Sequence, residues 1–140
     1  MGYRFIDHTA DVAADLTGRT VEELFTSAAQ ALTDTITHLD AVRPVVTQSV
    51  TLESGALDDL LVDWLNELLY RFEVQNVLVS DATVTIEESD GRWTLGATVA
   101  GEMFDTSRHP SRVGIKSATY HNLEVRQSSD GWRARIVFDI

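Results

Sequence analysis

Two acidic clusters, one near each end of the chain, contain the residues best suited to hold a metal ion. Asp139 and Ile140 follow a strongly apolar, strand-like segment, and Asp139 stands beside the chain's own carboxylate. The other cluster follows a short apolar segment near the N-terminus and includes His8 and Asp11. Carboxylate oxygens are preferred ligands of hard cations. If the two segments form neighbouring strands, Asp11 and Asp139 would converge on one ion.

Both clusters also have an ordinary structural explanation. Asp and Thr side chains in a polar turn can cap local backbone amides, which explains residues 7–11 about as well as metal binding does. Asp139 would then be a solvated residue that follows a strand. In the metal-binding alternative, Asp11 is a ligand and His8 is a hydrogen-bonding or proton-transferring neighbour.

The densest polar stretch of the chain covers residues 101–121. Within it, residues 114–121 alternate in a strand-like manner and include Lys116. Lysine is unfavourable in a half-buried strand unless its charge is paired. Lys116 is therefore predicted to pair with acids around Asp11 and Asp139, or to offer its charge to a phosphate or a partner carboxylate. A simple surface lysine is the remaining alternative.

Composition excludes several classes of function. The 140 residues include 22 acids against 11 Lys plus Arg, a net charge of −11, so strong direct binding to nucleic acid is not expected. A basic protein partner or a cation suits this charge better. The absence of Cys excludes disulfides, thiolate metal sites and thiol catalysis. No apolar run approaches the roughly 20 residues that span a bilayer, and the N-terminus lacks a signal-peptide apolar region, so we expect no membrane association and a cytoplasmic location.

The pattern of apolar residues predicts an α+β fold in one domain, residues 1–140, with two main helices packed on antiparallel β-sheet. A capping box at Thr20 and Glu23 starts the first helix, which runs to about Thr35, and eight apolar residues at helical spacing define the second, over about residues 57–72. Turns are expected at Asp90-Gly91 and Asp130-Gly131. About seven strands are expected: 3–16 with an interruption, 46–52, 77–79, 83–86, 93–99, 115–125 and 132–138.

No established catalytic motif is present. The chain lacks a phosphate-cradling glycine loop, a Gly-x-Ser-x-Gly elbow, a His-Glu-x-x-His zinc motif and a calcium-binding loop. Any metal site must therefore be assembled from distant segments. Oxygen ligands would favour calcium or magnesium over zinc.

Five short motifs, in order along the chain, together resemble the archease family. They are Asp7-His8-Thr9-Ala10-Asp11-Val12, Leu24-Phe25 with Ala28-Ala29, Trp64-Leu65-Asn66-Glu67-Leu68-Leu69, Ile115-Lys116 with Thr119-Tyr120-His121, and Asp139-Ile140. The resemblance runs from Tyr3 to Ile140. It implies a small acidic α+β protein that assists the GTP-dependent RNA ligase of tRNA splicing and RNA repair. Such a protein is a cofactor of the ligase and no enzyme itself: it promotes guanylylation of the ligase's active-site histidine and sustains multiple turnover.

The resemblance also implies a bound divalent metal, often calcium, with Mg²⁺ or Mn²⁺ as alternatives. Its ligands fall on Asp11, Asp139 and the main-chain oxygen of Ile140. The functional lysine of the family falls on Lys116, and we group His8 and His121 with it as residues that act on the partner. The chain departs from the family where Ser117 replaces a small apolar residue, and in the loop of residues 107–114.

The sequence is also compatible with three other functions. A metal-assisted hydrolase would use His8 or His121 as general base on a metal-bound water. A chaperone-like modulator would act on another tRNA-modifying enzyme, such as a tRNA methyltransferase. A purely structural module would leave Asp11 and Asp139 without a ligand.

Overall fold

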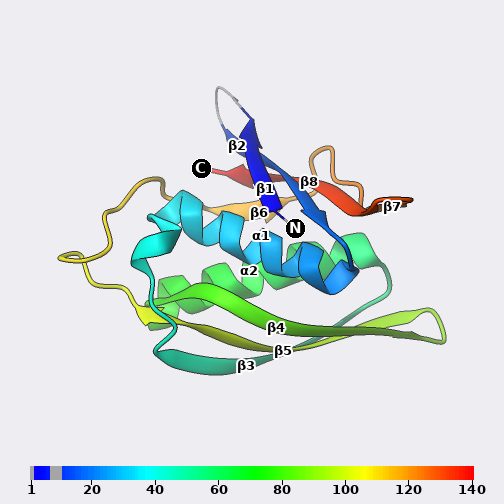
Figure 1. Cartoon of the computed structure of the whole chain (residues 1–140), viewed down its shortest axis with the longest axis horizontal. Coiled ribbons are helices and arrows are strands. Elements are labelled where there is room, and N and C mark those ends of the chain that lie inside the picture. Colours follow the sequence, from blue (N-terminus) through cyan, green and yellow to red (C-terminus); the bar gives the residue numbers. More distant parts are fainter. Residues whose placement is uncertain (1, 7–10) are drawn as a thin grey trace.

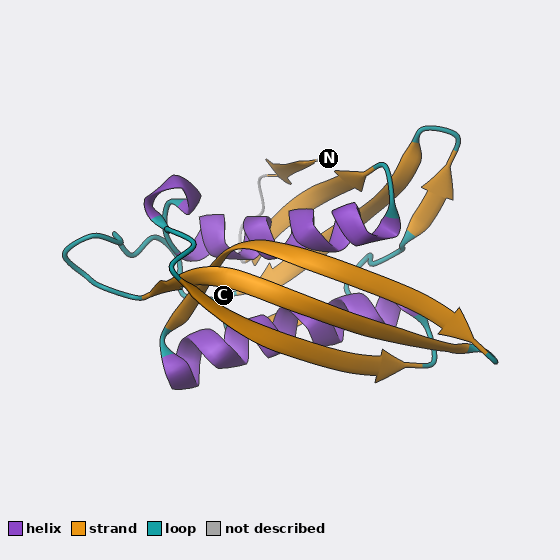
Figure 2. Ribbon diagram, turned by 60° about the horizontal axis from the view of Figure 1, so that its bottom comes forward, coloured by secondary structure: helices purple, strands orange, loops and turns teal. Residues whose placement is uncertain are grey.

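Two helices lie between two antiparallel β-sheets (Figure 1). The computed structural model of the chain describes residues 2–6 and 11–140. Figure 2 shows the three-stranded sheet laid across both helices, with the second sheet on their other side. No helix in the described residues is long and apolar enough to cross a membrane. This arrangement confirms the α+β fold with two main helices on antiparallel sheet.

The two sheets differ in strand order. One has five strands in the order β1-β2-β8-β6, with β7 also paired to β8, and the other has three in the order β3-β5-β4. The helices are α1 (Val21–Ile36) and α2 (Leu57–Gln75), with a short 3-10 turn at Leu39–Ala41. The strands are β1 (Gly2–Ile6), β2 (Asp11–Gly18), β3 (Val46–Ser54), β4 (Val77–Ser89), β5 (Arg92–Met103), β6 (Ser117–Thr119), β7 (Arg126–Ser128) and β8 (Gly131–Asp139).

The start of α1 confirms the predicted cap with one change of partner. The Thr20 hydroxyl accepts the amide of Glu23 at 3.1 Å, as a capping residue should. The Glu23 carboxylate, however, accepts the amide of Arg19 at 2.7 Å, one residue before the cap. Glu23 therefore also fixes the chain that enters the helix from β2.

Helix α2 supplies much of the core between the sheets. Its Leu60, Leu61, Trp64 and Leu65 are fully buried. The Trp64 indole donates to the backbone oxygen of Phe25 on α1 at 2.9 Å, so its one polar atom is satisfied inside the core. Burying each of these side chains stabilises the fold by about 1.5–3 kcal/mol.

Two of the predicted strand boundaries were wrong. Residues 77–79 and 83–86 belong to a single strand, β4, interrupted by an irregularity of register at Ser80. Residues 115–125 are not one strand, because only residues 117–119 and residues 126–128 pair with β8. A bulge and an irregular connection both break the alternation of side chains on which strand prediction rests.

Turn chemistry was predicted more accurately. Asp90 and Gly91 both have positive φ, 52° and 75°, as a two-residue hairpin turn of type I′ requires. The second hairpin turns at residues 129–130, one position earlier than expected, and Gly131 already pairs with Ser128. The shift matters little for the fold, because β7 and β8 still pair directly.

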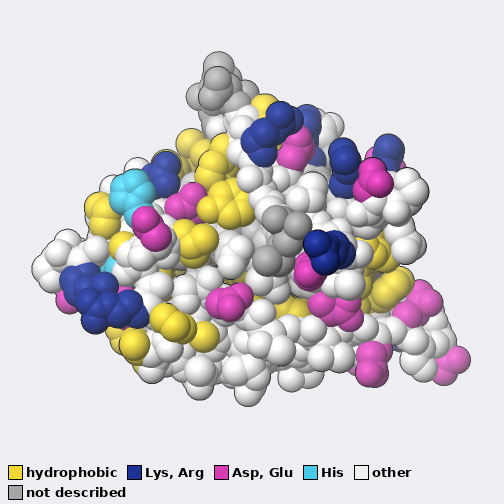
Figure 3. All heavy atoms as spheres, in the orientation of Figure 1, with side chains coloured by type: hydrophobic (Ala, Val, Ile, Leu, Met, Phe, Trp, Pro, Cys, Tyr) yellow, Lys and Arg dark blue, Asp and Glu magenta, His cyan; other side chains and the backbone are white. Residues whose placement is uncertain are grey.

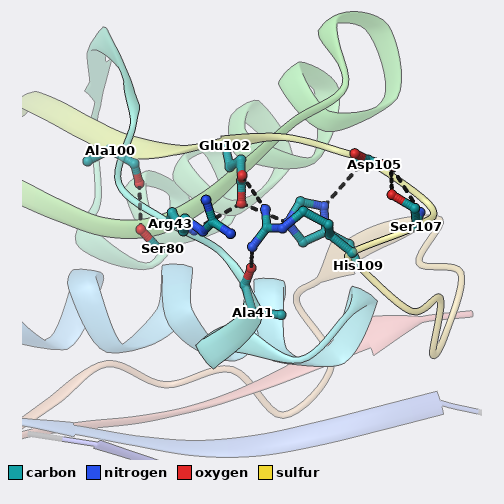
Figure 4. A network of polar contacts seen from close by, with 9 residues as sticks. Ala41, Arg43, Ser80, Ala100, Glu102, Asp105, Ser107 and His109 are labelled. Carbon is teal, nitrogen blue, oxygen red and sulfur yellow. Dashed lines mark hydrogen bonds and ion pairs between the residues drawn. The ribbon is translucent and has the colours of Figure 1, made fainter.

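A half-buried glutamate and a fully buried histidine anchor the loop between β5 and β6 (Figure 4). The ring of His109 is fully buried, and its Nε2 lies 2.9 Å from the Glu102 carboxylate. Its Nδ1 accepts the amide of Asp105 at 2.9 Å, which places the proton of the neutral ring on Nε2. Glu102 also receives the guanidinium of Arg108 and the amide of Arg43.

The same loop covers the end of α1. The amide of Arg112 donates to the oxygen of Ile36 at 2.9 Å, and that of Val113 to Thr35 at 3.2 Å. These bonds satisfy carbonyl groups that a helix end leaves without partners. The loop is thereby held by Glu102 and His109 near its start and by the end of α1 further along, before the chain reaches Lys116.

Replacing Glu102 should flatten the acid dependence of stability. The Arg108 guanidinium first, and then the amide of Arg43, hold the pKa of Glu102 down at about 2 against an ordinary value of 4.5. A lowered carboxyl pKa stabilises the fold above the unfolded value, and this contribution is lost as pH falls from about 4.5 through 2. Urea unfolding between pH 7 and pH 3 should show a smaller loss for Glu102→Gln than for the wild type, while the exposed Glu88→Gln control should follow the wild type. Equal losses in all three proteins would contradict the assignment.

Candidate functional site

Three of the sequence-predicted site residues meet at one end of the five-stranded sheet. Asp11 on β2 lies directly opposite Asp139 on β8 in the antiparallel register. On the other side of β8, Ser117 lies opposite Asp139, and the amide of Lys116 donates to the Asp139 oxygen at 2.7 Å. Segments from the two ends and the last third of the chain are therefore joined by backbone pairing at this point.

The pairing of Asp11 with Asp139 is unfavourable without a compensating charge. Directly opposite residues on antiparallel strands have Cβ atoms about 4.5–5.5 Å apart and project to the same face. Two carboxylates in this position repel each other, and a cation bound between them would remove the repulsion. The site thus fits an oxygen-binding divalent cation, although the fit is partial.

Among the described residues, the remaining ligands would have to come from groups other than carboxylates or imidazoles. Within residues 2–6 and 11–140, no three His, Asp or Glu side chains are close enough to hold a metal together. Calcium takes six to eight oxygen ligands. Main-chain oxygens such as that of Ile140, which is 39% exposed, and water would complete the set.

The charge of Lys116 is available to a partner. Its side chain is exposed and forms no ion pair with another described residue. Of the three alternatives that the sequence left open, pairing with an acid therefore receives no support among residues 2–6 and 11–140. The position of Lys116, one residue before β6, is fixed by its backbone bond to Asp139.

The two histidines assigned to the site have different outcomes. His8 lies outside the described residues. His121 is exposed in the turn after β6, and its amide donates to the Thr119 hydroxyl at 3.4 Å. Because β6 runs antiparallel to β8, His121 lies beyond the end of β6 that is remote from Asp139. Its role on a partner stays a prediction.

Helix α2 holds β6 in place through one side chain that the sequence patterns did not reveal. The Asn66 oxygen accepts the amide of Ala118 at 2.8 Å, and its nitrogen donates to the Ala118 oxygen at 3.3 Å. Both backbone groups on the outer edge of a three-residue strand are thus satisfied. From sequence, Asn66 is only a polar position on α2; its function as an edge cover depends on where β6 lies.

The first turn of α2 holds the segment that follows β6. The Asp58 carboxylate accepts the amide of Val125 at 3.2 Å. A hydrogen bond to Asp59, followed by burial, raises the pKa of Tyr120 to about 12, so the phenol stays protonated and donates to that carboxylate. Two acids in the first turn of α2 therefore bind the neighbouring segment.

Removing the Asn66 side chain should loosen β6 specifically. Asn66→Leu would leave two partly buried backbone groups without partners, at a cost of about 1–3 kcal/mol in the free energy of unfolding. Urea denaturation would measure this loss, and hydrogen exchange should show faster exchange of the Ala118 amide. Asn66→Asp, which keeps the acceptor but loses the donor, should retain more of that protection. An unchanged exchange rate in Asn66→Leu would exclude the anchoring role.

Comparison with known proteins gives one consistent result. A sequence model described as the archease protein family (MTH1598/TM1083) matches residues 3–140. The chain is 40% identical over 139 residues to the protein archease of Methanosarcina mazei, covering 99% of this chain and 95% of that one. It is 39% identical to the protein archease of Methanopyrus kandleri over the whole of both chains.

Solved structures agree with the sequence comparison. The solution structure of Methanobacterium thermoautotrophicum protein 1598 superimposes with a TM-score of 0.84 at 30% identity, covering 99% of both chains. The crystal structure of a Thermotoga maritima archease, described as a possible chaperone, gives a TM-score of 0.64 at 19% identity over 96% of this chain and 94% of that one, which supports the fold alone. By full-length sequence similarity and by fold, the chain belongs to the archease protein family.

Proposed function

We propose that the protein is an accessory factor of a GTP-dependent RNA ligase in tRNA splicing and RNA repair. In this proposal it promotes guanylylation of the ligase's active-site histidine and sustains multiple turnover. It does so with a divalent cation, calcium first and Mg²⁺ or Mn²⁺ as alternatives, held by Asp11, Asp139 and Ile140. Membership of the archease family supports an accessory role, and the convergence of Asp11, Asp139 and Lys116 supports its location.

The observation that carries the proposal is the backbone pairing that brings these residues together. Asp139 is exposed and Asp11 is half-buried. Their like charges oppose each other across β2 and β8. A cation bound between the two carboxylates would remove this repulsion, which supports a ligand-binding role for the pair.

The chemistry of guanylylation matches what this end of the sheet offers. The reaction brings an anionic triphosphate to a histidine. A cation held by Asp11 and Asp139 would supply positive charge to phosphate oxygens. The exposed ammonium of Lys116, fixed through its own backbone bond to Asp139, adds a donor that can approach the same phosphates or a carboxylate of the ligase. The protein would thus order the ligase's site and perform no reaction of its own.

The overall charge suits a protein partner that binds RNA. A ligase that grips RNA presents basic surface, and a chain of net charge −11 is steered towards such a surface by long-range attraction. This attraction is screened within about 10 Å at 0.1 M salt, so stimulation should weaken as salt rises.

Guanylylation of the cognate ligase with labelled GTP tests the proposal directly. Substoichiometric wild-type protein should accelerate labelling, and Asp139→Ala or Lys116→Ala should lose most of this acceleration while retaining the wild-type fold by circular dichroism. Glu88→Ala and Arg92→Ala remove the same charges from the other sheet and should stimulate like the wild type. Full stimulation by folded Asp139→Ala and Lys116→Ala would refute the proposed site.

Other outcomes of this experiment would select the alternatives. An active ligase that the wild-type protein does not stimulate would exclude the accessory role. Binding to a tRNA methyltransferase without effect on the ligase would favour a chaperone-like modulator. Chelator-sensitive turnover of a phosphate ester by the purified protein would instead favour a metal-assisted hydrolase.

Metal binding can be tested separately by calorimetry. Titration of Ca²⁺ into the wild-type protein should give one site, with Mg²⁺ and Mn²⁺ as comparison ions. Asp139→Asn should weaken this binding at least tenfold, because it removes half of the paired negative charge. Glu88→Gln serves as the matched control. Unchanged Ca²⁺ affinity in Asp139→Asn would place the cation elsewhere.

A further inference from the structure

A second surface, chemically opposite to the acidic end, lies further along the same sheet. A hollow of about 420 Å³ is lined by residues of β2 and β8 and by the chain before and within β7, including Asp15, Asn122, Arg126, Arg133 and Arg135. Two further hollows, of about 250 and 430 Å³, adjoin it and share Thr17 and Arg133 with it. We call this continuous surface the arginine groove.

Positive charge is concentrated in the arginine groove although the chain as a whole is strongly acidic. Figure 3 shows Lys and Arg side chains gathered in the upper right, over β2, β7 and β8. Five of the 11 basic residues line the three hollows, against three of the 22 acids. The basic residues are Arg4, Arg19, Arg126, Arg133 and Arg135, and the acids are Asp15, Glu124 and Asp130.

Two of these arginines face each other at a cost to stability. Arg126 on β7 lies directly opposite Arg133 on β8. Like charges in directly opposite positions destabilise a strand pair. A shift of the hairpin register would separate them, but it would place another residue at the position of Gly131. At this position φ is 127°, and a Cβ atom would lie 2.4 Å from the backbone oxygen of Gly18. An anion bound between the two guanidinium groups would remove the repulsion.

The acids in the groove do not neutralise it. Asp15 is shared by Arg135, at 2.8 Å, and Arg4, at 3.3 Å, and the Arg135 hydrogen bond holds the pKa of Asp15 below its ordinary value. Glu124 pairs with Arg126. Arg133, which lines all three hollows, forms no ion pair with another described residue. These contacts orient the guanidinium groups and leave their other N–H donors available for bidentate binding of phosphate.

We propose that the arginine groove binds the phosphate backbone of a single-stranded RNA segment while the protein is associated with the ligase. The inference rests on the proposed accessory function and adds a contact to the ligase's RNA substrate. Arg133 and Arg135 are alternate residues of one strand, about 6.6 Å apart, and present a row of cations that a polyphosphate chain can follow. Trp132 also lines the adjoining hollow, but its side chain packs against the core, so the guanidinium groups supply the contacts to RNA.

A nucleic acid explains these features better than an acidic protein surface does. A row of guanidinium groups can follow the regularly spaced phosphates of a nucleic-acid strand and bind them bidentately. The groove ends at Arg135, four residues, or about 13 Å, along β8 from Asp139. One RNA strand could therefore lie along the arginine groove with its reacting end near the ligase's site. Because the whole chain carries a charge of −11, the isolated protein should bind RNA weakly and only at low salt.

An NMR titration of the ¹⁵N-labelled protein with single-stranded RNA of about ten nucleotides tests the proposal. At about 50 mM salt, the backbone amides of Arg126 and Arg133 and the indole of Trp132 should shift, and the shifts should largely disappear at about 200 mM salt. The double variant Arg126→Ala/Arg133→Ala should bind about tenfold more weakly. Arg92→Ala, which removes a similarly paired arginine from the other sheet, should bind like the wild type.

The Asp15→Asn variant distinguishes an RNA-binding role from a structural one. Removing the carboxylate that Arg4 and Arg135 share should tighten RNA binding several-fold, whereas a merely structural ion pair would give no gain. No shifts in the groove, equal shifts with a poly-glutamate peptide of matched charge, or no tightening in a folded Asp15→Asn protein would each overturn the proposal. Because this titration contains no ligase, its result is independent of the guanylylation experiment, and either proposal can fail alone.

Discussion

The antiparallel pairing of β2 with β8 is the constraint on which the rest of the structure depends. It joins a strand that starts at Asp11 to one that ends at Asp139, and every residue of β2 has a partner in β8. Hydrogen bonds along this ladder set the register, and a shift by one residue would turn the buried Ala14 and Ile136 to the solvent. The opposition of Asp11 and Asp139 is thus enforced by the core and does not depend on any attraction between the two acids.

The helices hold the segments that lie beside this ladder, including β6 and the loop before it. Trp64 ties α2 to α1 within the core, and Asn66, two residues further on, reaches out to β6. The loop before β6 is anchored at its start by His109 and Glu102. The backbone of Lys116 therefore lies between two fixed segments, the loop anchored by His109 and strand β6. Its exposed ammonium forms no ion pair with another described residue. The side chain of Lys116 is flexible, but its backbone position is fixed.

Opposite charges are separated along one sheet. Acidic residues lie where β2 begins and β8 ends, and arginines lie where β7 joins β8. The net charge of −11 describes the molecule only at long range, where it favours a basic protein partner. At contact distance the local arrangement of side chains decides what binds. A protein of this composition can therefore approach a basic ligase as a whole and still offer a cationic groove to a phosphate chain.

The sequence by itself determined the helices, the turn at Asp90-Gly91 and the chemical character of the two terminal clusters. These features depend on short-range physics: capping, 3.6-residue periodicity and backbone conformations that glycine permits. The apolar pattern also predicted the α+β fold, and family resemblance, carried by motifs in a fixed order, added the function and the roles of the candidate residues. The continuity of β4 through its irregularity at Ser80 and the division of residues 115–125 escaped prediction because both arise from packing against α1 and α2 and leave no regular pattern in the chain.

Only the tertiary structure decided which of these residues meet. The sequence allowed Asp11 and Asp139 to converge only if their strands were neighbours, and the ladder between β2 and β8 makes them so. It gave no sign that Asn66 would cover the edge of β6, or that Arg126 would face Arg133. Contacts between residues so distant in the chain depend on sheet order and register, which are set by the burial of the whole core and by no local segment.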